Sequence, residues 1–143
     1  MLHAVKENLQ ELYIAENQIK DADMVDFLAE PISQMPKLRI LVLARNGVLS
    51  KYGSAGLLAQ MAQYKQGLAD QAPIALEKLD LTGTLLQDDG ITEILPLIAE
   101  HFACLNTFLF NACRLTEQSG PALADFIENR FPLNRPLHLE MKL

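Results

Sequence analysis

Apolar residues recur along this chain in an eleven-residue pattern that holds one polar position near its end. In the first copy, from Leu9 to Ile19, apolar residues stand at positions one, four, six and eleven, and Asn17 stands at position nine. The later copies begin at Leu38, Leu76, Leu105 and, in shortened form, Asn134. A motif that recurs every roughly 20–50 residues is typical of repeat proteins, in which each unit packs only on its neighbours.

Each copy predicts a short strand followed by a helix. Within Leu76–Leu81, Leu79 and Leu81 point to one face of a strand. Lys78 and Asp80 point to the other face, because side chains alternate along a strand. The residues that follow place apolar side chains at three- and four-residue steps, which is the helical period. The predicted apolar helix faces are Met24, Phe27, Leu28, Ile32 and Met35; Leu57, Leu58, Met61 and Leu68; Ile91, Ile94, Leu95, Ile98 and Phe102; and Leu123, Phe126, Ile127 and Phe131.

Helix-start residues accompany these faces. We expect Asp88 or Asp89 to cap the third helix, because a side-chain oxygen can accept the first free N–H groups. Thr116 or Ser119 can cap the fourth helix in the same way. Pro121 then falls near the first helical turn, where its missing N–H costs nothing.

The copies start 29, 38, 29 and 29 residues apart. The second repeat is therefore nine residues longer than the others (38 against 29), and we assign the additional residues to a helix and loop at 49–75. Insertions in repeats usually emerge as loops on one face, and such loops often carry recognition. Tyr52 and Tyr64 would be natural contacts there. A neutral difference in length explains the insertion equally well.

Position nine predicts a buried polar residue at the turn after each strand. Asn17 and Asn46 are expected to turn inward and bond the backbone, because a buried amide without a partner is costly. Thr84 takes this position in the third copy, so one rung of the internal ladder is weaker or is carried by a hydroxyl. Cys113 takes it in the fourth copy as a small, weakly polar core residue.

The motif LxxLxLxx(N/C)xL followed by a helix, at a 29-residue period, resembles the leucine-rich repeats of the ribonuclease-inhibitor class. The resemblance covers nearly the whole chain and is specific for fold, not for function. It implies one α/β solenoid domain spanning 1–143, with parallel strands on the concave face and helices on the convex face. About four full repeats and a partial one are expected. Asp23 stands where other repeats carry Gly53, Gly90 and Gly120, so the first helix is expected to begin with a different turn.

Both ends of the sequence interrupt a repeat. Leu2, Val5 and Leu9 have the spacing of a final helical turn that leads into a strand, and Leu143 is the last position of the fifth copy. Terminal repeats normally carry a polar cap. We therefore expect a segment of a longer array, or ends that are covered by a partner or by another copy. An uncovered edge strand is a site of association.

The outward positions of the strands supply the candidate contact residues. Tyr13, Ile40 and Val42 form an apolar corner on neighbouring strands, and outward apolar clusters often mark contact sites. The full candidate site is Tyr13, Ile40, Val42, Lys78, Asp80, Leu109, Asn111 and His138. Ordinary β-forming residues tolerated on a sheet explain the same pattern equally well.

Composition narrows the class of partner and the compartment. The chain has 143 residues, of which 50% are apolar and 21% are charged, as in one compact globular unit. The net charge is −6 and no basic run is present, which argues against nucleic acid or an anionic membrane as a partner. No apolar stretch is long enough for a transmembrane helix, and the N-terminus does not resemble a signal peptide.

The two cysteines point to a reducing compartment. Cys104 and Cys113 are nine residues apart along an extended segment, which is too far for a disulfide. We expect a cytoplasmic protein, or a protein delivered into a host cytoplasm if it is a bacterial effector.

The sequence contains no arrangement of residues that predicts catalysis. His3, His101 and His138 are widely spaced and form no metal-binding pattern. The sequence lacks a GxSxG motif, a phosphate-binding loop and a dinucleotide loop. Asp80 and His138 would stand two strands apart in one column, roughly 10 Å, which is too far for a direct acid–base pair. We expect no enzyme activity, no cofactor and no metal.

These features together predict a protein-interaction module in which a rigid curved sheet presents side chains from several strands to one protein partner. Relatives of this repeat class include ribonuclease inhibitor, sensor regions of innate-immune receptors, actin-regulatory scaffolds and bacterial effectors, and the resemblance does not choose among them. One alternative is an accessory domain of GTPase-activating type. A GTPase-activating protein of this repeat class depends on more repeats and a strongly acidic tail, and this chain has neither. The other alternative is self-assembly through the open ends.

Overall fold

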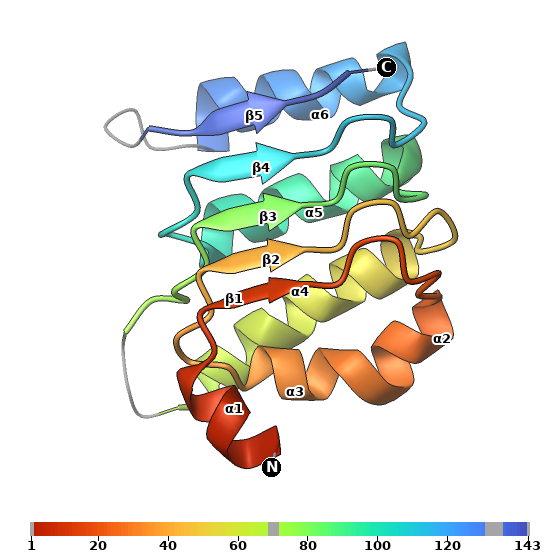
Figure 1. Cartoon of the computed structure of the whole chain (residues 1–143). Coiled ribbons are helices and arrows are strands. Elements are labelled where there is room, and N and C mark those ends of the chain that lie inside the picture. Colours follow the sequence, from red (N-terminus) through yellow and green to blue (C-terminus); the bar gives the residue numbers. More distant parts are fainter. Residues whose placement is uncertain (1, 69–71, 131–135, 143) are drawn as a thin grey trace.

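The protein has a mixed α/β fold with one five-stranded parallel sheet. The computed structural model describes residues 2–68, 72–130 and 136–142. The strands follow the order of the chain and are β1 (Glu11–Tyr13), β2 (Ile40–Val42), β3 (Lys78–Asp80), β4 (Thr107–Leu109) and β5 (His138–Glu140). Figure 1 shows them stacked in order, with α1 (Leu2–Asn8) and β5 at opposite ends.

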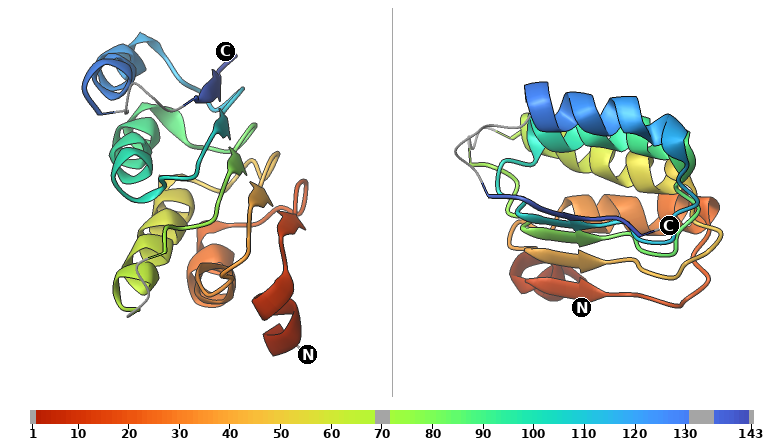
Figure 2. Two further views of the ribbon diagram at one scale, coloured as in Figure 1. Left: turned by 90° about the vertical axis from the view of Figure 1, so that its left-hand side faces the viewer. Right: turned by 90° about the horizontal axis from the view of Figure 1, so that it is seen from above.

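The helices form a second layer on one face of this sheet, as the two views of Figure 2 show. The first repeat contains α2 (Asp21–Asp23), the π-helical turn η1 (Met24–Leu28) and α3 (Ala29–Ser33). The second and third repeats each carry one long helix, α4 (Lys51–Gln66) and α5 (Gln87–His101). The fourth repeat contains the 3-10 turn η2 (Glu117–Ser119), α6 (Gly120–Asp125) and the π-helical turn η3 (Phe126–Arg130).

The core lies between the sheet and the helices and confirms the strand pattern. Leu41, Leu79 and Phe108, at the middle of β2 to β4, are at most 1% exposed. The rings of Phe108 and Phe110 stack with their centroids 4.6 Å apart. The predicted apolar face of the third helix is confirmed in full, since all five of its residues are buried: Ile91, Ile94, Leu95, Ile98 and Phe102.

Two residues that were predicted to lie in the core, one aromatic and one aliphatic, are exposed. Phe27 is 71% exposed and Ile127 is 58% exposed. Both lie in π-helical turns, in η1 and η3. A π-turn holds more residues than an α-turn, so it rotates the residues that follow away from the three- and four-residue pattern. Ala29 is buried one residue after Leu28, as this rotation requires. Phe131 lies outside the described residues.

The register of the last strand corrects the fifth copy of the motif. Thr107 pairs with His138, whereas Lys78 pairs with Thr107. The last step of the ladder is thus 31 residues long and the preceding one 29. The fifth copy consequently begins at Pro136 and not at Asn134, which lies outside the described residues. Glu140 therefore takes the strand position that we had assigned to His138.

The insertion in the second repeat is distributed along the repeat. Val48 is exposed and Leu49 is fully buried, so the second copy ends one residue later than predicted. The connection after α4 spans residues 67–75, which is nine residues, against three residues at 102–104 after α5. Leu57, Leu58 and Met61 of α4 are buried as predicted, and Leu68, beyond the helix end, is exposed.

A buried amide at position nine closes the turn after β2. Asn46 is 0% exposed, and its Oδ1 accepts the N–H groups of Asn17 and Ile19 at 3.0 Å each. Its Nδ2 donates to the carbonyls of Ile14, at 3.0 Å, and Leu43, at 2.8 Å. The prediction for Asn46 is confirmed.

The other three residues at position nine differ from Asn46. Asn17 is exposed and its side-chain amide donates to the nearby Ala15 carbonyl, so its predicted inward orientation is wrong. The Thr84 hydroxyl donates to Leu81 O at 2.8 Å, as expected for a rung carried by a hydroxyl. The Cys113 thiol is buried and bonds the same carbonyl at 3.1 Å.

Two glycines at helix starts leave little room for a side chain. A Cβ on Gly53 would lie 2.5 Å from Leu49 Cδ1 in its own repeat and 2.7 Å from Asp21 Oδ1 in the preceding one. A Cβ on Gly90 would lie 2.7 Å from Leu86 Cδ1 in its own repeat and 3.2 Å from Lys51 Cβ of α4. Asp23 stands at this position in the first repeat, and its Oδ2 accepts the Lys20 N–H at 2.9 Å. The different start of the first helix is thus confirmed.

The Asn46 amide predicts a large difference between two asparagines at the same motif position. Asn46→Ala leaves two buried N–H groups without their acceptor, and should lower the free energy of unfolding by about 3 kcal/mol. Asn17→Ala, at an exposed position, should change it by less than about 0.5 kcal/mol. Urea unfolding followed by circular dichroism measures both. Equal effects of the two substitutions would show that the buried amide is not what closes the turn.

Two serines of α4 predict opposite responses. The Ser50 hydroxyl caps the helix by accepting the Tyr52 N–H, so Ser50→Ala should cost about 1 kcal/mol. The Ser54 hydroxyl is buried and has no hydrogen-bond partner in the described structure, so Ser54→Ala should be neutral or stabilising. Thermal unfolding of the two variants tests this, and a clear loss of stability in Ser54→Ala would reveal a partner for that hydroxyl.

Candidate functional site

The candidate site is the face of the sheet that points away from the helices, here called the strand surface. Its side chains lie in three rows that cross all five strands in register. The first row is Glu11, Ile40, Lys78, Thr107 and His138, and the second is Tyr13, Val42, Asp80, Leu109 and Glu140. The third row is Ala15, Ala44, Thr82, Asn111 and Lys142.

The apolar corner of the strand surface is smaller than predicted. Tyr13, on the outer strand β1, is 60% exposed, and Ile40 is half-buried. Val42 belongs to the outward row, as predicted, but only 8% of it is exposed. It lies on an inner strand, and its register partners Tyr13 and Asp80 flank it on both sides. Val42 therefore forms part of the floor of the surface.

Tyr13 is held in place by its own strand. Its hydroxyl donates to Glu11 Oε1 at 3.0 Å. This hydrogen bond to a carboxylate raises the pKa of Tyr13 above its ordinary value, because ionising the phenol would lose the bond and repel the charge. Tyr13 is thus a protonated, exposed aromatic ring with a fixed hydroxyl.

The polar half of the strand surface covers β3 to β5. Lys78, Asp80, Leu109 and Asn111 are all half-buried there. Asp80 Oδ1 accepts the Thr82 N–H at 2.9 Å, which fixes its carboxylate beside the end of β3. Asn111 Nδ2 donates to Glu140 Oε1 at 2.8 Å. These bonds orient the polar side chains before any partner is present.

Glu140 is a site residue that sequence reasoning missed, because the two-residue shift of β5 was not visible in the motif. Its carboxylate also lies 3.3 Å from His138 Nε2 and 3.8 Å from Lys142 Nζ. The Asn111 amide, followed by His138, holds the pKa of Glu140 below its ordinary value. Glu140 is therefore an ionised carboxylate in the second row, with Leu109 between it and Asp80.

The structure does not place His138 in the column of Asp80. His138 belongs to the first row, beside Thr107, and its ring contacts Glu140 on its own strand. Half or more of the His138 side chain is exposed. Its role in the site is thus to orient Glu140 and to present an imidazole at the edge of the surface.

The tyrosines of the insertion lie on the helix layer and not on the strand surface. Tyr52, at the start of α4, is 70% exposed. Tyr64, near its end, lines a surface groove of about 230 Å³ together with Ser33, Gln34 and Gln60. Tyr64 is 38% exposed, and a contact role for either tyrosine stays a prediction.

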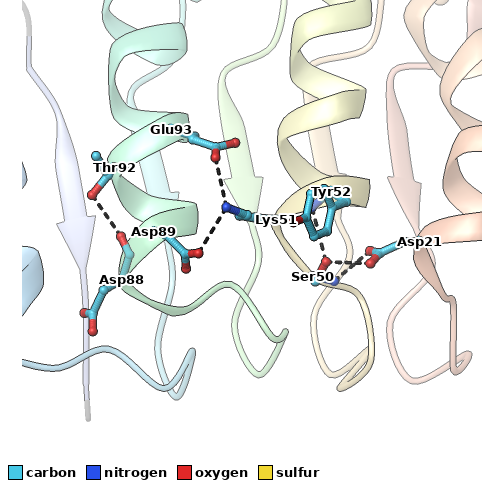
Figure 3. Close-up of polar contacts among 8 residues, drawn as sticks. All are labelled: Asp21, Ser50, Lys51, Tyr52, Asp88, Asp89, Thr92 and Glu93. Carbon is cyan, nitrogen blue, oxygen red and sulfur yellow. Dashed lines mark hydrogen bonds and ion pairs between the residues drawn. The ribbon is translucent and has the colours of Figure 1, made fainter.

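A second set of polar contacts joins the N-terminal ends of the helices (Figure 3). Asp21 of α2 bonds the Ser50 N–H and hydroxyl and the Gly53 N–H at the start of α4. Lys51 of α4 contacts Asp89 at 3.0 Å and Glu93 at 3.1 Å on α5. These charged side chains therefore have a structural role, because each one joins two neighbouring helices.

Asp88 has the same role as Asp21, one helix further along. It accepts bonds from the Thr116 N–H and hydroxyl and from the Ser119 hydroxyl. The bond from Ser119, followed by those from Thr116, lowers the pKa of Asp88. The predicted capping of α5 by Asp88 or Asp89 is therefore wrong, since both lie in the first turn of that helix. The predicted cap of the fourth helix by Thr116 is confirmed.

Metal and thiol chemistry find little support in this part of the molecule. Among the described residues, His, Cys, Asp and Glu side chains form no group of three or more that could hold a metal ion. Cys104 and Cys113 are free thiols. Burial raises the pKa of Cys113, which keeps it in the unreactive thiol form. No helix in the described ranges combines the length and apolar character needed to cross a bilayer.

The hydrogen bond between Asn111 and Glu140 predicts a measurable change in the pKa of Glu140. Asn111→Ala removes the largest of the causes that lower this pKa, so the pKa should rise toward that of an ordinary glutamate. His138→Ala, which removes the second cause, should raise it by less. Carboxyl chemical shifts followed by NMR during a pH titration give both values. The reverse order of the two effects would contradict this geometry.

Comparison with known proteins finds relatives in fold and none in sequence. No protein-family model and no curated protein sequence matches the chain. A solved structure described as the tropomodulin C-terminal domain, from structural genomics of Caenorhabditis elegans, matches with a TM-score of 0.73 and 16% identity, over 99% of this chain and 78% of that one. A structure of leiomodin-1 actin-binding site 2 matches with a TM-score of 0.75 and 15% identity, over 99% of this chain and 77% of that one. At these identities the likeness shows the fold alone, and that fold fits a leucine-rich repeat arrangement.

Proposed function

We propose that this chain is a protein-interaction module, without enzyme activity, that binds a protein partner on its strand surface. The observation that carries the proposal is Tyr13, a large aromatic side chain that is 60% exposed on a preformed sheet. Exposed aromatic residues are enriched among the side chains that contribute most to binding at protein interfaces. Its neighbours Ile40 and Val42 supply an apolar floor, so a partner side chain can be desolvated there.

The polar half would supply specificity. Lys78, Asp80, Asn111 and Glu140 are fixed by the sheet and, in three cases, by hydrogen bonds to neighbouring groups. A partner therefore meets side chains whose ordering entropy has already been lost on folding. Leu109 and His138 complete the proposed contact set.

Fold likeness supports a first partner to test. The leiomodin-1 structure is described as an actin-binding site, so actin is the protein with which the proposal is examined first. We also propose that the fold is a solenoid of the ribonuclease-inhibitor class and that the protein works in a cytoplasm, where its free thiols would stay reduced.

Self-association is a second candidate function. The inward-facing Leu12 of β1 and Leu139 of β5 are only partly buried, whereas Leu41 and Leu79 of the inner strands are buried completely. Partly covered core residues on outer strands favour the addition of another strand or chain. Light scattering over a range of protein concentrations reports this separately from partner binding.

The proposal predicts that a charge at Tyr13 weakens binding and that a charge at an equally exposed tyrosine on the helix layer does not. Tyr13→Asp should weaken the binding of monomeric actin by at least about tenfold, because the aromatic contact is replaced by a hydrated carboxylate. Tyr52→Asp on α4 is the matched control and should bind as the wild type does. Calorimetric titration gives the affinities, and circular dichroism verifies that each variant is folded.

Two results would count against the proposal in different ways. If the wild-type chain does not bind actin, actin is not the partner. If Tyr13→Asp binds as tightly as the wild type while Tyr52→Asp does not, the partner binds on the helix layer and the strand surface is not the site.

A further inference from the structure

Two kinds of side-chain contact join neighbouring repeats of this chain, and both follow the same alternation. The repeats are counted from the first residue of each motif, so repeat 1 begins at Leu9, repeat 2 at Leu38, repeat 3 at Leu76 and repeat 4 at Leu105. The first kind of contact lies inside the turns, at position nine of the motif. The second lies at the N-terminal ends of the helices.

The inner contacts link repeat 2 to repeat 1 and repeat 4 to repeat 3. Asn46 of repeat 2 reaches back to the backbone of Ile14, Asn17 and Ile19 in repeat 1. Cys113 of repeat 4 reaches back to the Leu81 carbonyl in repeat 3. Thr84 of repeat 3 has a shorter side chain, and its hydroxyl donates to that same carbonyl in its own repeat.

The helix-end contacts show the same alternation. Asp21 of repeat 1 bonds the start of α4 in repeat 2, and Asp88 of repeat 3 bonds Thr116 and Ser119 in repeat 4. Lys51 occupies the equivalent place in repeat 2. Gly53 packs against Asp21 just as Gly90 packs against Lys51, which establishes the equivalence. A lysine has no acceptor, so it cannot cap the helix of the next repeat.

Within the described residues, therefore, neither kind of contact crosses from repeat 2 to repeat 3. Backbone hydrogen bonds do cross, as from Leu43 N to Asp80 O, and α4 packs on α5. Among the described residues, the polar side-chain contacts across this junction include ion pairs of Lys51 with α5 and of Arg39 with Glu77, and these lie at or near the surface. Exposed ion pairs contribute little and weaken with salt, whereas Asn46 and Cys113 make buried hydrogen bonds across the other two junctions. The connection 67–75, which leads into repeat 3, is also the long one.

We propose that the junction between repeats 2 and 3 is a seam that divides the protein into two cooperative units, repeats 1–2 and the part of the chain from repeat 3 onward. In repeat proteins, stability is a sum of repeat and nearest-neighbour contributions, so a weaker junction separates units that open independently. The seam runs between β2 and β3. If the strand surface is the binding site proposed above, its apolar half lies on one unit and its polar half on the other. The two halves can then shift relative to each other when a partner binds.

Hydrogen exchange with two matched substitutions tests the seam on the free protein, so the result does not depend on whether a partner binds. Asp21→Ala removes a helix cap from the first unit, and Asp88→Ala removes the equivalent cap from the second. Asp21→Ala should speed amide exchange in α4 roughly fivefold and leave exchange in α5 unchanged. Asp88→Ala should speed exchange in α5 and α6 and leave exchange in α4 unchanged. Asn46→Ala and Cys113→Ala repeat the comparison from the inside of the turns.

The proposal is overturned if each substitution speeds exchange in α4 and α5 equally, because the chain would then open as one unit. Lys51→Met supplies a further readout. It removes the two ion pairs of Lys51 that cross the seam and leaves Arg39–Glu77, so it should reduce the effect of salt concentration on exchange in α4 and α5. An undiminished effect of salt in the variant would contradict the proposal that these pairs hold the junction.

Discussion

The structure depends on satisfying the backbone groups of the turn that leads from each strand to its helix. Some of these groups, such as the Ile19 N–H and the Leu43 carbonyl, are buried between neighbouring repeats and need partners inside the protein. Asn46 provides two donors and an acceptor with two lone pairs, and it bonds four backbone groups in two repeats. Thr84 and Cys113 fill the same space with fewer bonds, so the repeats are alike in shape but unequal in how firmly they are joined.

The spacing of leucines predicted the parts of the molecule that obey one regular period. The strands, the buried face of α5 and the inward Asn46 belong to this group, because each depends on local alternation and on a neighbour of equal length. The failures come from places where a neighbour or a period changes. Asn17 has no preceding turn to bond in the described chain, and π-turns rotate Phe27 and Ile127 into solvent. The register of β5 depends on the length of the connection before it, and the motif does not specify that length.

The candidate site was predicted as a surface and less well as a set of residues. Alternation along the strands correctly separated outward from inward side chains. It could not show that Val42, flanked on both sides within a curved sheet, is covered while Tyr13 on the outer strand is open. Nor could it find Glu140, whose pairing with Asn111 follows from the shift of β5. Exposure on a sheet is thus a property of the position among strands as much as of the position along one strand.

A single column of the sequence carries information on how the repeats are coupled. Asp21, Lys51 and Asp88 occupy equivalent places, and each looks like an ordinary charged residue at a helix start, where acids interact favourably with the helix dipole. In the structure the two aspartates serve the next helix more than their own, because that helix presents free N–H groups and a hydroxyl at hydrogen-bond distance. A lysine in the same column is a donor and needs acceptors on the following helix, where Asp89 and Glu93 contact it. An acceptor in this column therefore adds a helix cap between two repeats, whereas a cation adds ion pairs in its place. The same column, read for its hydrogen-bonding character along the chain, marks the junction that we propose as the seam.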